Sequence, residues 1–315
     1  MFYPLFLSPF FKQCVWGGEG LKKKLNKQYK EKNIGESFEV SCYKNYLSTI
    51  KNGVFKETHL KTLVETYPKE ILGKNISSDF FPLIIKFLDA KDKLSVQVHP
   101  NDKYAIKNAM SLGKNELWYV VHANENSRIV LGVKNYISID DIKASIDENN
   151  FESVLNIEKV NIGDCIFIPS GTVHALLEDI IVLEVQQASD VTYRLYDWNR
   201  ENSEVKRDLH IKDALNVLNV QSRGNIIRRS DYSEKSKHNL ISIKDFTVDY
   251  IKINNSYLDD TFYKSFHIYT CIDGNGRITY NGESNSIERG DTFLIPACLS
   301  SYEIRGNLEV LKTYV

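Results

Sequence analysis

Residues 163–174 read GDCIFIPSGTVH, the most informative stretch of the chain for its architecture. The Gly163-Asp164 pair predicts a turn, and the apolar run 165–168 that follows it predicts a buried strand. Pro169 cannot donate a hydrogen bond to a neighbouring strand, so it ends the strand. His174 then lies just beyond a tight Pro/Gly turn, at the start of the next strand, where its side chain has little freedom.

The same phrase returns 127 residues further along the chain, where residues 290–297 read GDTFLIPA. Six of the eight positions match or are conservatively replaced, which favours duplication and therefore two related β-domains. The copies differ after the proline. The first continues to His174, whereas residues 298–301 of the second, CLSS, contain no imidazole. We therefore expect the first copy alone to be able to carry a metal.

The rest of the chain is also rich in strand signals. Short segments rich in Val, Ile, Phe and Tyr, bounded by Gly, Pro, Asn or Asp, are typical of an antiparallel sandwich or barrel; they lie at 37–43, 80–87, 93–99, 117–123, 127–133, 164–169 and 180–187. Helical spacing occurs at 101–112, with Gly113 as the stop, from Ser138 with a capping box to Asp141, and at 211–220. The polar stretch 222–238 is interpreted as a solvated connection.

The predicted fold is mainly β, with two jelly-roll or β-sandwich domains and helical insertions in the N-terminal part. We expect residues 1–235 to form a catalytic, metal-binding domain and residues 236–315 to form a metal-free β-domain. The 315 residues carry a net charge of −1, which gives no overall attraction to nucleic acid or to anionic lipid. Any bound anion must be held by a few local cations.

Five widely spaced cysteines in a chain of this size favour reduced thiols and a cytoplasmic protein. The apolar start, MFYPLFLSPFF, lacks a preceding basic residue and is interrupted by Pro4 and Pro9. It is therefore interpreted as a strand pair docked on the core rather than as a signal peptide. No apolar run elsewhere approaches the roughly 18 residues of a membrane span.

Four polar residues could converge on one metal ion. Gln97 and His99 alternate on one strand and face the same side. Glu116 opens the strand 117–121 and would be their neighbour if the two strands pair. Together with His174 they offer two imidazoles, a carboxylate and an amide oxygen, a donor set that suits a divalent ion with zinc preferred.

Each member of this set also has an ordinary interpretation. Gln97 alone could be a polar strand residue, and Glu116 alone could pair with Lys114. The long intervals between the residues carry little weight, so the Pro-x-Gly-x-x-His phrase is the strong element. The remaining histidines are interpreted as hydrogen-bonded surface or core residues: His59, His122, His210, His238 and His267.

The phrase from Gly163 to His174 resembles the second conserved motif of the cupin superfamily. Residues 94–102, LSVQVHPND, and 81–90, FPLIIKFLDA, resemble the type I mannose-6-phosphate isomerases in their short bacterial form. Further short segments match at 16–18, 35–41, 115–119 and 191–198, and the resemblance extends over essentially the whole chain. Two departures are visible, Phe38 where the family usually has Trp and Glu178 where the cupin motif closes with Asn.

The resemblance implies zinc bound by His99, Glu116 and His174, with Gln97 as a fourth ligand in some relatives. It further implies reversible conversion of D-mannose 6-phosphate to D-fructose 6-phosphate without a redox cofactor. Arg194 matches the family's active-site arginine, and Lys86 resembles its pocket lysine. The implied partner is a small sugar phosphate, with no nucleic acid or membrane, in a monomer or a homodimer.

Isomerisation through a cis-enediol needs stabilisation of charge on O1 and O2 and a base for the C2 proton. Arg194 stays protonated, so it would orient substrate oxygens or stabilise the enediolate. Lys86, a zinc-bound hydroxide and Glu184 are the candidate bases, and the choice stays open. Lys86, Ser95 or Asn101 could meet the phosphate.

Two other function classes are compatible with a cupin fold. The first is a metal-binding cupin that senses or stores a sugar without catalysis, which the segment around Arg194 disfavours. The second is an iron-dependent dioxygenase, which the missing His-x-His start disfavours. Turnover of mannose 6-phosphate separates both from the isomerase.

Overall fold

The computed structural model describes residues 2–76, 80–200 and 207–315. Both copies of the repeated phrase form the same turn. Gly163 and Gly290 have φ of 87° and 92°, a left-handed conformation that glycine adopts without strain. Their amides donate to the carbonyls of Val120 and Cys271, each at 2.8 Å. The duplication predicted from the sequence is thus expressed in the backbone.

The chain is mainly β and antiparallel, as predicted, and the N-terminal part holds two sheets whose apolar faces pack on each other. The seven-stranded sheet has the order β16 (Asn225–Ile227), β12 (Cys165–Ile168), β9 (Glu116–Ala123), β14 (Ile180–Gln187), β7 (Leu83–Ala90), β3 (Ile34–Val40) and β2 (Phe10–Gly18). The five-stranded sheet has the order β11 (Leu155–Lys159), β10 (Arg128–Val133), β13 (His174–Leu176), β8 (Val96–Val98) and β15 (Tyr193–Tyr196).

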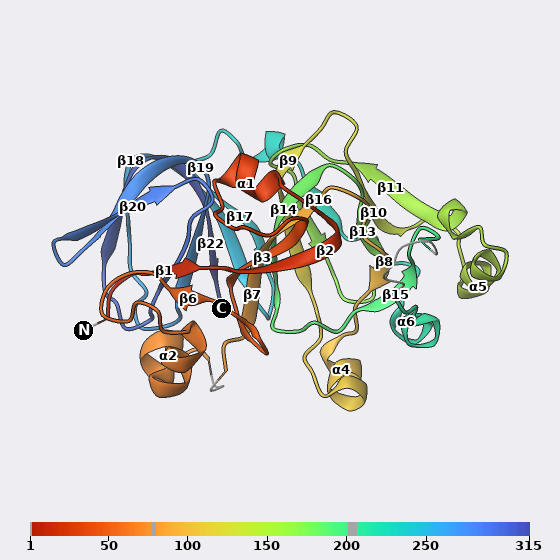
Figure 1. The fold of residues 1–315 in the computed structure, drawn as a ribbon, viewed down its shortest axis with the longest axis horizontal. Helices are drawn as coiled ribbons and strands as arrows, with labels where there is room; N and C mark the ends of the chain where they lie inside the picture. The colour runs from red at the N-terminus through yellow and green to blue at the C-terminus, as the bar shows by residue number, and fades with distance from the viewer. Residues whose placement is uncertain (1, 77–79, 201–206) are drawn as a thin grey trace.

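The C-terminal strands form an eight-stranded sheet that two N-terminal strands complete (Figure 1). Its order is β17 (Lys237–Ser242), β18 (Thr247–Asp259), β22 (Tyr302–Tyr314), β19 (His267–Tyr280), β21 (Thr292–Ile295), β1 (Leu5–Ser8) and β6 (Thr49–Ile50), with β20 (Glu283–Glu288) paired to β19. Of the two strands in the predicted N-terminal pair, β1 joins the sheet of the second copy, whereas β2 pairs with β3 in the seven-stranded sheet. The division of the chain at residue 235 stays a prediction.

Short helices lie on the outside of the sheets (Figure 1). They are α1 (Gly20–Leu25), α2 (Leu60–Thr66), α3 (Pro68–Leu72), α4 (Asp102–Ala109), α5 (Ile139–Asp147) and α6 (Ile211–Val217), with 3-10 turns at Phe151–Val154 and Arg229–Asp231 and a small hairpin of β4 (Cys42–Tyr43) and β5 (Tyr46–Leu47). The capping box of Ser138 and Asp141 forms as predicted. No helix in the described ranges is long and apolar enough to cross a membrane.

Three local predictions were wrong. The helix expected over 211–220 ends at Val217. The helix at 101–112 ends at Ala109, because Met110 takes the left-handed conformation three residues before Gly113. The stretch 222–238 is not merely a solvated connection, since β16 pairs with β12. Arg229 Nη2 also donates to both carboxylate oxygens of Glu309 of β22, at 2.9 and 2.7 Å. This segment therefore joins the two halves of the chain.

Candidate metal centre

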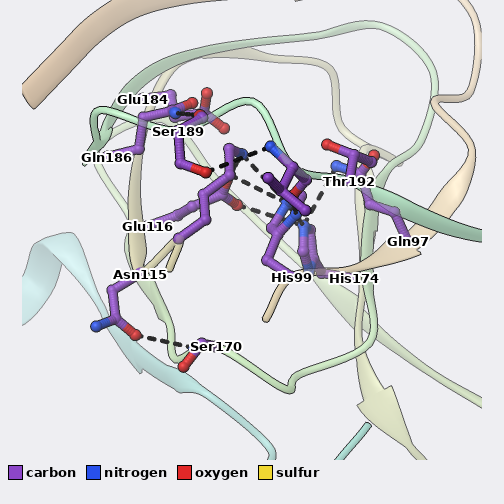
Figure 2. Close-up of polar contacts among 12 residues, drawn as sticks. Gln97, His99, Asn115, Glu116, Ser170, His174, Glu184, Gln186, Ser189 and Thr192 are labelled. Carbon is purple, nitrogen blue, oxygen red and sulfur yellow. Dashed lines mark hydrogen bonds and ion pairs between the residues drawn. The ribbon is translucent and has the colours of Figure 1, made fainter. Parts of the chain in front are cut away.

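The three residues His99, Glu116 and His174 meet where the two N-terminal sheets face each other. His99 follows β8, and His174 begins β13, which pairs with β8 through Gln97. Glu116 begins β9 in the other sheet. The pairing of the Gln97 and Glu116 strands that the sequence considered does not occur. The carboxylate instead reaches the imidazoles across the space between the sheets (Figure 2).

The candidate ligand atoms of this group lie close enough together to be compared with the corners of a tetrahedral metal site. His99 Nε2 lies 3.1 Å from His174 Nε2. Glu116 Oε1 lies 3.2 Å from His99 Nε2, and Glu116 Oε2 lies 3.3 Å from His174 Nε2. Zinc bonds of about 2.0–2.2 Å place the corners of a tetrahedron about 3.3–3.6 Å apart. The observed distances lie at or just below this range, and Glu116 approaches each imidazole with a different oxygen, so the three side chains could hold a metal ion.

The outer nitrogen of each imidazole is fixed by the backbone. His99 Nδ1 donates to the carbonyl of Val191 at 2.9 Å, and His174 Nδ1 donates to the carbonyl of Thr172 at 2.9 Å. A hydrogen on Nδ1 leaves a lone pair on Nε2, the arrangement seen in metal-bound histidines. Burial lowers the pKa of His174 to about 4 and lowers that of His99, so both rings are neutral at pH 7.

Glu116 and Lys114 supply the remaining evidence at the centre. Glu116 is fully buried, and its Oε2 accepts no hydrogen bond from the described residues. A buried carboxylate oxygen without a donor is costly unless a cation neutralises it. Lys114 contacts Glu116 Oε1, the pairing that the sequence left open, and its Nζ lies 3.2 Å from His99 Nε2. Burial lowers the pKa of Lys114 to about 7.

Gln97 stands between the centre and an open cavity. Its Nε2 lies 3.3 Å from His174 Nε2, and rotation of the amide by 180° would present Oε1 to the same point. The adjoining cavity has a volume of about 490 Å³. Its walls bring together Gln97, Lys114 and the two cations expected from the sequence, Lys86 and Arg194. All six predicted site residues therefore lie at or beside one site.

One wall of this cavity is a row of alternating charges on adjacent strands. Lys12, Glu36, Lys86 and Glu184 lie on β2, β3, β7 and β14, which are neighbours in the sheet. The nitrogen–oxygen distances along the row are 2.7, 3.0 and 2.9 Å. Although burial opposes ionisation, Lys86 lowers the pKa of Glu36 and of Glu184 to about 2. The pKa of Lys86 is raised because the two carboxylates outweigh its burial.

Arg194 lies on β15 at another side of the cavity. Its Nε donates to Ser95 Oγ at 3.0 Å, and its Nη1 donates to the carbonyl of Asp208 at 2.7 Å. Among the described cations that line the cavity, Arg194 is the one with no ion pair to a carboxylate. Its charge is thus available to an anionic ligand.

Sequence reasoning gave no role at the site to Lys114, Lys12 or Glu36. The sequence suggested Lys114 only as an ion-pair partner of Glu116. A role at the site could have been inferred from its position two residues before Glu116, because alternate residues of an extended chain face the same side. Lys12 and Glu36 carry no such signal. Their place beside Lys86 depends on the order β2-β3-β7, which no local pattern reveals.

Comparison with known proteins agrees with this geometry. The family model of the phosphomannose isomerase type I catalytic domain matches residues 5–133, and that of the mannose-6-phosphate isomerase cupin domain matches residues 236–315. The chain is 34% identical to mannose-6-phosphate isomerase of Streptococcus mutans, covering 99% of this chain and 98% of that protein. It is 33% identical to mannose-6-phosphate isomerase ManA of Bacillus subtilis, covering 99% of each.

A solved structure shows the same fold. The crystal structure of the mannose 6-phosphate isomerase from Bacillus subtilis superposes with a TM-score of 0.91 at 33% identity, covering 99% of both chains. The sequence relatives, the matched structure and the grouped site residues point to one family. The chain therefore belongs to the type I mannose-6-phosphate isomerases.

Proposed function

We propose that this protein is a zinc-dependent isomerase that interconverts D-mannose 6-phosphate and D-fructose 6-phosphate through a cis-enediol. The observation that carries the proposal is the group His99, Glu116 and His174, with ligand atoms 3.1–3.3 Å apart beside a cavity of about 490 Å³. Gln97 is proposed as a fourth ligand. When bound, zinc supplies a Lewis acid that polarises the substrate oxygens at C1 and C2.

Arg194 is proposed to hold the anionic part of the reacting sugar. Its guanidinium stays protonated throughout, so it cannot take part in proton transfer. It faces the cavity without a neutralising carboxylate, and Ser95 fixes its orientation through the bond to Nε. A preorganised cation of this kind stabilises the negative charge that develops on the enediolate oxygens.

Lys86 and Glu184 are proposed to bind sugar hydroxyls rather than to move the C2 proton. They form an ion pair at 2.9 Å, and Trp118 Nε1 donates to Glu184 at 2.8 Å. The pKa of Glu184, about 2, makes it a poor base, while the raised pKa of Lys86 keeps its amine protonated. A fixed donor and a fixed acceptor side by side are suited to neighbouring hydroxyl groups.

A cytoplasmic setting is proposed from the thiols and the substrate. All five cysteines are free, and Cys165 and Cys271 are buried. Free thiols in a chain without disulfides are typical of a reducing compartment. We therefore propose that the enzyme is cytoplasmic and that its small-molecule partner is a phosphorylated sugar.

A coupled assay tests the proposal. Mannose 6-phosphate is added to zinc-loaded protein, and fructose 6-phosphate formation is followed with and without EDTA. Turnover that stops on chelation and returns with zinc supports the isomerase. Zinc-loaded protein that binds mannose 6-phosphate without turnover would instead indicate a sugar-sensing cupin.

A further inference from the structure

The C-terminal copy contains a buried polar cluster at the position that the metal group holds in the N-terminal copy. The shared turn fixes the correspondence. Val120 and Cys271 each accept from the turn glycine and donate to the carbonyl of the following aspartate. Glu116 lies four residues before Val120, and His267 lies four residues before Cys271. The pairing partners agree, since Glu116 pairs with Ile168 and His267 with Ile295, equivalent positions of the repeat.

Two further positions follow from the strand pairing. His174 begins β13 and pairs with Gln97, whereas Tyr302 begins β22 and pairs with Asp259. The imidazole that the sequence did not find after Pro296 is thus supplied by His267, from another strand. His174, Gln97 and Glu116 correspond to Tyr302, Asp259 and His267.

The charges are inverted on the neighbouring strand. Glu184 of β14 pairs with Trp118, and Lys312 of β22 pairs with Tyr269. Trp118 and Tyr269 each lie two residues after the first residue of β9 or β19, so Glu184 and Lys312 occupy the same place. The N-terminal copy has a carboxylate there, and the C-terminal copy has an ammonium.

The cluster is closed around Asp259. Lys312 Nζ donates to Asp259 Oδ2 at 2.6 Å, and Tyr269 Oη donates to the same oxygen at 2.6 Å. His267 Nδ1 lies 2.6 Å from Tyr302 Oη and 3.9 Å from Asp259 Oδ2. Asp259 Oδ1 accepts the amide of Asp260 at 2.9 Å. Both carboxylate oxygens have donors here, unlike Glu116 Oε2 in the first copy.

We propose that Lys312 is the resident cation of the C-terminal copy, its ammonium filling the position that a metal ion takes in the N-terminal copy. The side chain of Lys312 is 7% exposed, and that of Asp259 is 15% exposed. Lys114 meets only one oxygen of Glu116 and leaves Oε2 without a donor, whereas both oxygens of the largely buried Asp259 accept hydrogen bonds, so Asp259 offers no free oxygen to a divalent ion. This copy therefore holds its own interior together without metal.

A double-mutant cycle tests the ion pair. Lys312→Met leaves Asp259 buried without its cation and should lower the Tm of the full chain by on the order of 10 °C. Lys312→Met combined with Asp259→Asn removes both charges and should recover part of that loss. Effects of the two substitutions that simply add, or a Lys312→Met chain as stable as the wild type, would overturn the proposal.

A metal count on the zinc-loaded full chain tests the exclusion of metal. His174→Ala should remove all tightly bound zinc, because the C-terminal position is filled. An equivalent of zinc that survives His174→Ala but is lost on Asp259→Asn would place a metal in the C-terminal copy and refute the assignment. This count and the Tm cycle need no substrate, so failure of the isomerase proposal would not affect them.

Discussion

At the scale of single residues, backbone carbonyls decide which nitrogen of each histidine faces the centre. Thr172 and Val191 hold the Nδ1 hydrogens, so the two Nε2 lone pairs and the Glu116 carboxylate point at one another. Lys114 contacts Glu116 Oε1 and lies 3.2 Å from His99 Nε2, but Glu116 Oε2 accepts no hydrogen bond from the described residues, and a bound cation would relieve that cost. The metal is therefore expected to contribute to the stability of the fold as well as to the chemistry.

Loss of one imidazole should remove the metal. We expect His174→Ala to retain less than one tenth of the zinc that the wild type keeps after dialysis, measured by elemental analysis, because two ligands remain of the buried three. His122→Ala is the matched control, since that histidine lies on β9 away from the centre. Stoichiometric zinc in His174→Ala would show that the coordination set is wrong.

Loss of the cavity arginine should affect the reaction and spare the metal. Arg194→Ala is expected to lower kcat/KM by on the order of 10²–10³, the usual effect of removing a donor that stabilises developing charge. Arg194→Lys should recover only part of the lost kcat/KM, because an ammonium cannot reproduce the two guanidinium hydrogen bonds to Ser95 and to the Asp208 carbonyl. Zinc content should equal that of the wild type in both variants. Near-normal kcat/KM in Arg194→Ala would show that this residue does not stabilise the reacting sugar.

Much of the site at this scale could be predicted from the sequence. The turn before His174 and the alternation of Gln97 and His99 are local patterns, and they were enough to identify these three residues. Arg194 and Lys86 came from the family resemblance. The charge row through Glu36 could not be predicted, because strands β2, β3 and β7 are far apart in the sequence and adjacent only in the sheet.

At the scale of elements, the turn between β12 and β13 positions the metal group. Gly171 has φ of 88°, and a Cβ there would lie 3.1 Å from the carbonyl oxygen of Val217. Gly282 has a similar φ of 81° in the hairpin between β19 and β20, yet nothing lies within 4 Å of its Cβ position. The two glycines thus share a backbone requirement and differ in their surroundings.

We expect Gly171→Ala to lower stability by about 1–3 kcal/mol and to weaken zinc binding, because relief of the strain moves His174. Gly282→Ala should cost only the backbone term, about 1 kcal/mol, and leave zinc binding unchanged. Urea unfolding and competition with a chelator measure the two effects. Equal zinc affinity in both variants would mean that the turn does not position the ligand.

The elements themselves were predicted unevenly. Strands bounded by Gly and Pro were identified, and so was the capped helix α5. The end of α4 was misplaced because Met110, which has no intrinsic preference for the left-handed conformation, adopts it. The strand β16 was missed because its residues, Asn225–Ile227, become a strand through pairing with β12. Edge strands of this length carry almost no local signal.

At the scale of the whole molecule, two β-domains share one core but differ in their buried charges. A continuous cluster contains Phe87 and Tyr119 from the first copy and Tyr250 and Leu311 from the second. The repeat in the sequence predicted the two copies. It could not predict that β1 would pair with β21, because that contact joins residues 5–6 to 293–294. Nor could it reveal the Lys312 cluster, which depends on the pairing of β22 with β18 and β19.

Acid should destabilise the protein in a defined pH range. The pKa of Glu36 is about 2 in the folded protein, because Lys86 and Lys12 outweigh its burial, and its ordinary value is 4.5. A depressed carboxyl pKa contributes stability above pH 4.5 and loses it as the pH falls toward 2. Glu184 and Asp259 behave alike, with pKa values of about 2.

Thermal unfolding in EDTA from pH 7 to pH 2.5 measures this contribution without interference from metal release. We expect the Tm to change little above pH 5 and to fall steeply below pH 4.5. Glu36→Gln should flatten the acid slope, whereas Glu65→Gln, an exposed residue of α2, should leave it unchanged. An acid slope in Glu36→Gln equal to that of the wild type would contradict the buried charge row.

Titration of the metal-free enzyme with zinc shows whether one metal centre drives the reaction. Conversion of mannose 6-phosphate to fructose 6-phosphate is followed as zinc is added in fractions of an equivalent. We expect no turnover without metal and a rise that ends sharply at one zinc per chain. Full turnover by the metal-free chain, or activity that keeps rising to two equivalents, would contradict a single catalytic metal centre at His99, Glu116 and His174.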